Sequence, residues 1–130
     1  MFFSNSRTTF ADISDGSSNT ILVGERSGEL NTTGSTGDLG MRFFDSSWLG
    51  VVVGSDFAGW RVVGWTGEPP NNSPTSEVHF HSYAQFNSDH PGLAIFSLCD
   101  GSTHNINDRI DPDVFRALGS TSGGETIGRF

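Results

Sequence analysis

Lysine is absent from the 130-residue chain, whose 7 basic residues are all arginines set against 15 Asp and Glu. The formal charge at neutral pH is −8. Binding to a nucleic acid backbone requires a cluster of positive side chains. The composition therefore argues against nucleic acid as a partner.

Cysteine occurs once, so the chain can form no internal disulfide and has no CxxC pair. Cys99 ends an apolar run that starts at Leu93, which predicts a buried thiol rather than a reactive one. No stretch approaches the ~18 consecutive apolar residues of a membrane span, and Met1 to Asn5 lack the features of a signal peptide. If the protein functions outside the cytoplasm, its export segment was removed or lies on a longer precursor.

Charged residues are also scarce, at 17% of the chain, and Ser, Thr and Asn supply the polar surface instead. Such a surface suits a secreted protein. The length is that of one domain, and no linker, repeat or charge run divides the chain. We expect a single globular domain over residues 1–130.

The first half of the chain contains several short apolar segments between turns. Residues 10–16 predict a turn of helix, and residues 19–25, which are β-branched and apolar, predict a buried strand. Residues 31–40 predict a surface loop. The segments 48–53 and 59–65 predict the two strands of a hairpin.

The second half has the sharper signals. Three prolines in residues 67–74 predict an exposed loop. The apolar run 92–99, the turn Asp100-Gly101 and the alternating segment 102–107 together predict a β-hairpin.

A short helix is predicted over residues 111–118. Asp111 is suited to the N-cap, Pro112 to the first helical position and Gly119 to the end. Three apolar residues are expected to pack inward: Val114, Phe115 and Leu118. These elements define an α+β, sheet-dominated fold with mostly antiparallel strands and one or two short helices.

Three blocks of sequence together resemble one bacterial family. They are residues 10–25, the segment from His90 to Ser102, and Asp111 to Leu118 followed by Gly123-Gly124-Glu125. The chain is similar to the pilin-like, pseudopilin-type proteins of unknown function whose C-terminal motif is His, nine residues, Asp-Gly, the domain associated with prepilin-type processing. His90 and Asp100-Gly101 match that spacing.

The resemblance implies a pilin-like globular head that lies outside the cytoplasm or at the bacterial cell surface. Members of the family usually begin with a hydrophobic helix that anchors the subunit, and this sequence lacks one. A membrane association is therefore expected only through that absent helix. The resemblance implies no catalytic residues.

The motif residues are expected to be structural. A neutral His90 imidazole can bond to backbone or to the Asp100 carboxylate across the hairpin, which would make a clasp. Gly101 supplies the turn, and Asp15-Gly16 forms the other Asp-Gly turn of the chain.

Two oxygen-rich stretches are candidate Ca²⁺ sites, because extracytoplasmic domains often bind this ion through carboxylate, amide and backbone oxygens. One lies around the first turn and contains Asp12, Asp15, Ser17 and Asn19. The other, which the likeness to pseudopilins favours, contains Asn105, Asn107, Asp108, Asp111 and Asp113. The alternative for both is capping and turn formation.

His79 and His81 lie on one face of a predicted strand and could share Zn²⁺. Packing beside aromatic residues is the alternative and is favoured, since the chain has no HExxH segment or cysteine cluster. A metal-dependent hydrolase would use these two with His90, and the sequence does not favour an enzyme.

The sequence therefore predicts an extracytoplasmic structural or interaction domain that works through protein partners or self-association. The alternative is a ligand-binding module, for a glycan on exposed tryptophans or for a metal-pinned peptide. The sequence establishes no cofactor, and Ca²⁺ is the favoured candidate.

Overall fold

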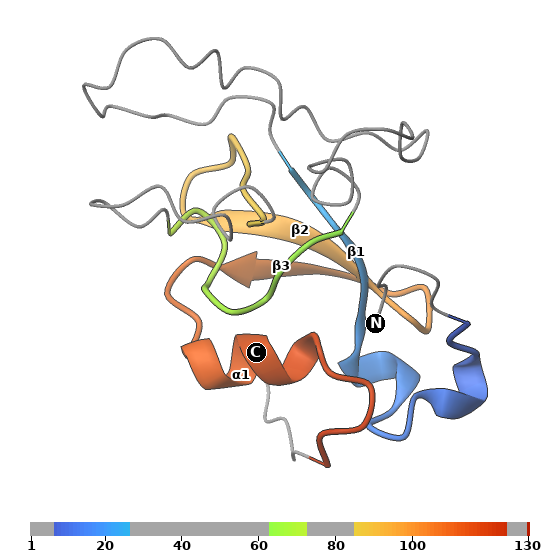
Figure 1. The fold of residues 1–130 in the computed structure, drawn as a ribbon. Helices are drawn as coiled ribbons and strands as arrows, with labels where there is room; N and C mark the ends of the chain where they lie inside the picture. The colour runs from blue at the N-terminus through green and yellow to red at the C-terminus, as the bar shows by residue number, and fades with distance from the viewer. Residues whose placement is uncertain (1–6, 27–62, 73–84, 125–129) are drawn as a thin grey trace, which may run out of the picture.

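The computed structural model describes residues 7–26, 63–72, 85–124 and 130. Within them the chain forms a three-stranded sheet with a short helix on one face (Figure 1). The elements, in chain order, are the 3-10 helices η1 (Phe10–Asp12) and η2 (Ser17–Asn19), the strands β1 (Ile21–Gly24), β2 (Leu93–Leu98) and β3 (Thr103–Asn107), and the helix α1 (Pro112–Leu118). The predicted α+β, sheet-dominated class with antiparallel strands is confirmed.

The sheet has the order β1-β2-β3, and both pairs are antiparallel. β2 and β3 form the hairpin that the sequence predicts, with Gly101 at φ 85° in the turn, a conformation that glycine adopts without strain. β1 comes from a distant part of the chain and pairs with β2 through a bulge between Ile21 and Val23.

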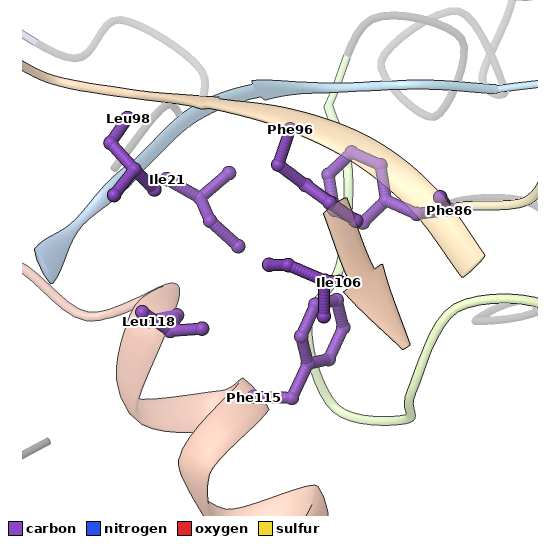
Figure 2. Packing of buried hydrophobic residues seen from close by; sticks show 8 residues of the cluster. Ile21, Phe86, Phe96, Leu98, Ile106, Phe115 and Leu118 are labelled. Atoms are coloured by element: carbon purple, nitrogen blue, oxygen red, sulfur yellow. The ribbon is translucent and has the colours of Figure 1, made fainter. Parts of the chain in front are cut away.

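The core lies between the sheet and α1 (Figure 2). Side chains of β2 alternate between its two faces, so that Ala94, Phe96 and Leu98 are fully buried. The rings of Phe86, Phe96 and Phe115 meet edge to face, with centroids 5.0 to 6.4 Å apart. This aromatic cluster ties the helix, the central strand and the segment before β2 together.

Helix α1 begins as the sequence predicts. The Asp111 carboxylate accepts hydrogen bonds from the backbone N–H of Asp113 at 2.8 Å and of Val114 at 3.4 Å. Pro112 occupies the first turn, where no N–H is needed. Phe115 and Leu118 are buried as expected, and Val114 is half-buried.

Removing the cap should destabilise the domain measurably. We expect Asp111→Ala to lower the free energy of unfolding by about 1 kcal/mol, because two N–H groups lose their acceptor. Urea unfolding followed by circular dichroism measures the loss. Asp111→Ser is the matched control, since its hydroxyl can cap the same groups, and an equal loss in both variants would contradict a capping role.

Two parts of the chain differ from expectation. Residues 67–72 do not form an exposed loop, because Pro69 and Pro70 are buried and the Gln85 side-chain amide donates to the carbonyl oxygens of Pro69 and Asn72. The predicted helical turn over 10–16 reduces to η1, where Phe10 is 72% exposed.

Several of the predicted segments lie partly or wholly outside the described residues. The loop 31–40, the strand 48–53 and residues 59–62 lie outside them. Trp65 forms an isolated parallel bridge with Gln85. Cys99 is buried as predicted, and burial raises the pKa of its thiol. The described helices include none that is long and apolar enough to cross a membrane.

Candidate functional site

The three sequence blocks on which the resemblance was based lie around β2 in the structure. At one end of this strand, Glu25 continues the pairing of β1: its N–H donates to the Ile95 carbonyl at 2.8 Å, and its carboxylate accepts from the Ile95 N–H at 3.2 Å. His90 Nε2 lies 3.6 Å from the other Glu25 carboxylate oxygen. The last residue of the first block therefore contacts the histidine of the second.

At the other end of β2, the Asp-Gly turn contacts η2. The backbone N–H of Asp100 donates to the Ser17 carbonyl at 3.0 Å, and that of Cys99 donates to the Thr20 carbonyl at 2.9 Å. Thr20 is fully buried, and its hydroxyl donates to the carbonyl oxygens of Gly16 and Ser120. These bonds fix the hairpin turn against the first block.

The Asp15 carboxylate joins the first block to the loop after α1. Its two oxygens accept from the backbone N–H of Gly123 at 2.8 Å and of Gly124 at 2.9 Å. The Thr121 carbonyl in turn accepts from the N–H groups of Ser14 and Asp15. We call this arrangement of Asp15 with residues 121–124 the Asp15 clasp. The bonds to the glycines lower the pKa of the Asp15 carboxyl.

The clasp should make stability depend on pH in the acid range. The pKa of Asp15 is lower in the folded state than in the unfolded state. The clasp therefore stabilises the folded protein at pH values above the ordinary aspartate pKa, and this stabilisation is lost as the pH falls through the pKa of the folded state. We expect Asp15→Asn to lower the melting temperature at pH 7, and the difference from the unaltered protein to shrink steadily as the pH falls below the ordinary aspartate pKa. Thermal melts of both proteins across this range test this; a difference that is constant with pH would contradict the assignment.

His90 and Asp100 do not form the expected clasp with each other. They lie beyond opposite ends of β2, a strand of 6 residues, and a strand rises ~3.3 Å per residue. No hydrogen bond or ion pair joins these two described residues; His90 contacts Glu25, and Asp100 accepts from the backbone and hydroxyl of Ser102. The spacing of nine residues therefore reflects the length of the strand between two separate contacts.

Ser102 and His104 are neighbours of Asp100 that the sequence reasoning did not select. The Ser102 hydroxyl donates to Asp100 at 2.6 Å and lies 3.1 Å from His104 Nε2. The hydrogen bonds from the hydroxyl and the backbone N–H of Ser102 lower the pKa of the Asp100 carboxyl, and the charge of His104 has a smaller effect in the same direction. Because the hydroxyl proton is directed to the carboxylate, the serine is not set up as a nucleophile activated by the histidine. Their spacing of two residues within the alternating segment 102–107 was the available signal.

Three residues of the second candidate Ca²⁺ stretch have other side-chain contacts in the structure. Asn107 accepts from the Arg109 N–H at 2.8 Å, Asp111 caps α1, and Asp113 pairs with Arg116. Asn105 is exposed on β3, and Asp108 is half-buried in the turn that follows. The capping and turn-forming alternative thus describes the observed side-chain contacts of Asn107 and Asp111.

In the first stretch, Asp12 accepts from the backbone and hydroxyl of Thr9, which lowers the pKa of its carboxyl. The Asn19 amide donates to the Asp15 carbonyl at 3.1 Å. His79 and His81 lie outside the described residues. Among the residues that are described, no group of three or more His, Cys, Asp or Glu side chains is placed to hold a metal ion.

The fold and the contacts around β2 define a small α+β domain whose sequence blocks converge on the central strand. A family model described as "Protein of unknown function (DUF1559)" matches residues 1–113, and the chain belongs to this family. The family is associated with pilin-like and pseudopilin-like proteins. No curated protein matches the chain. No solved structure matches it either.

Proposed function

We propose that the chain is an extracytoplasmic structural or interaction domain, the globular head of a pilin-like or pseudopilin-like protein. It acts by presenting its surface to protein partners. The observation that carries this proposal is that the three sequence blocks are engaged in internal contacts: Asp15 holds the loop after α1, and Glu25 contacts both β2 and His90. Family membership supports the likeness to pilins.

The polar composition agrees with this location. The surface relies on Ser, Thr and Asn, and the net charge of −8 favours solubility. The mixed sheet-and-helix core provides a rigid support from which exposed segments can contact a partner.

The single buried cysteine allows a direct test of location. Ser18 is exposed in η2, so a Ser18→Cys variant presents a reactive thiol, whereas the unaltered protein has only buried Cys99. In the native host, a membrane-impermeant maleimide should label the variant on intact cells. The unaltered protein, as the matched control, should be labelled only after denaturation. Labelling of the variant that requires cell lysis would contradict the proposed location.

A further inference from the structure

The outer edge of β3 has backbone groups that point away from the sheet. The Leu98 N–H donates to the Ser102 carbonyl, and the Asp108 N–H donates to the Gly92 carbonyl, so the backbone groups of Ser102 and Asp108 face β2. In an antiparallel pair, successive residues direct their N–H and C=O groups alternately toward the partner strand and away from it. Thr103 and Asn105 therefore direct these groups outward. No described strand pairs with that side of β3.

β3 also lacks the features that usually protect an edge strand. It contains no charged residue, no proline and no bulge, and it pairs in unbroken register with β2 from Thr103 to Asn107. Natural edge strands are commonly blocked by at least one of these features. The side chains of Thr103, Asn105 and Asn107 are exposed on the outer face.

An apolar groove lies beside this strand. It has a volume of about 310 Å³ and includes Ile106, Ile110 and Val114, with Phe130 on its wall and Arg109 and Asp111 contributing polar groups. Ile106 points from β3 toward α1 (Figure 2). A strand added to β3 would extend the sheet, so that its side chains on the core face would lie next to this groove.

We propose that the β3 edge pairs with the β3 edge of a second copy of this chain, in antiparallel orientation about a two-fold axis at Asn105. This register places Thr103 opposite the second copy's Asn107, and His104 opposite its Ile106. The arrangement is self-complementary, as a two-fold interface requires.

Charge complementarity favours a second copy over an unrelated strand. Asp100 precedes β3 and Arg109 follows it, and both are exposed. The two-fold axis therefore brings the arginine of each copy toward the aspartate of the other, at both ends of the paired strands. The proposal goes beyond the proposed function, because it assigns a surface and a partner.

Hydrogen exchange at several protein concentrations tests the pairing directly. The outward amides of Thr103 and Asn105 should exchange more slowly as the concentration rises, while the amide of Phe96 in β2 should not change. Protection that is independent of concentration would overturn the proposal, because it would mean that the same chain covers the edge.

Sedimentation of variants tests whether the dimer forms through the β3 edge. Asn105→Pro removes an outward N–H without removing a bond to β2, and should raise the dissociation constant of the dimer by about tenfold or more. If that variant fails to fold, Arg109→Glu tests the same edge, since it places like charges together at both ends. Arg116→Glu is the matched control on the exposed side of α1.

The two folded edge variants should thus associate more weakly than the control. Restored association in an Arg109→Glu, Asp100→Arg double variant would be expected from the charge pairing. An unaltered protein that stays monomeric at millimolar concentration, or edge variants that associate as strongly as the control, would overturn the proposal. These results are separate from the labelling test of location, so either idea can fail alone.

Discussion

Replacing Phe96 by alanine is expected to remove a large part of the stability of the domain. The side chain is fully buried on the central strand and contacts the rings of Phe86 and Phe115 edge to face. Truncating such a residue costs about 3–5 kcal/mol, and small domains are commonly stable by only about 5–15 kcal/mol. Urea unfolding monitored by circular dichroism measures the loss.

Phe10→Ala is the matched control for this effect, because the same side chain is 72% exposed at that position. Surface substitutions usually change stability by less than about 0.5 kcal/mol. Similar losses in the two variants would contradict the assignment of Phe96 to the core.

Adding one methyl group at Gly24 is the second change with a large expected effect. A Cβ at this position would lie 2.5 Å from Phe96 Cε1 and 2.6 Å from two ring carbons of Phe86. Both rings are held in the core, so neither can move freely. We expect Gly24→Ala to cost about 1–3 kcal/mol, as overpacking of a core does.

A double-mutant cycle distinguishes this clash from a general effect on β1. Phe86→Leu removes part of the ring that the new methyl group would meet, so Gly24→Ala should cost less in that background. Val23→Ala, at the exposed neighbouring position, should have little effect. An equal cost of Gly24→Ala in both backgrounds would exclude the ring of Phe86 as the cause.

The hairpin and α1 could be predicted from sequence because their signals are local. Asp100-Gly101 specifies a turn, apolar alternation specifies the faces of a strand, and Asp111 before Pro112 marks the start of a helix. Each signal lies within a few residues of the structure that it produces, and each of these elements is confirmed.

The contacts around β2 could not be predicted, because they depend on how distant segments meet. Glu25 reaches Ile95 across 70 positions in the chain, and Asp15 reaches Gly123 across 108. The sequence marked His90 and Asp100 as related, but it could not show that each has its own partner. Burial of Pro69 and Pro70 was missed for a similar reason, since it depends on the distant Gln85 amide.

Contacts between distant segments of the chain, which join Asp15 to the loop after α1 and Glu25 to β2, are expected to stabilise the domain. The Asp15 clasp is the clearest case, and NMR can observe it through the backbone amides of Gly123 and Gly124. Both amide shifts should titrate together, with a midpoint below the ordinary pKa of aspartate, and Asp15→Asn should abolish the titration. Amides that do not titrate, or that titrate at or above the ordinary value, would contradict the account.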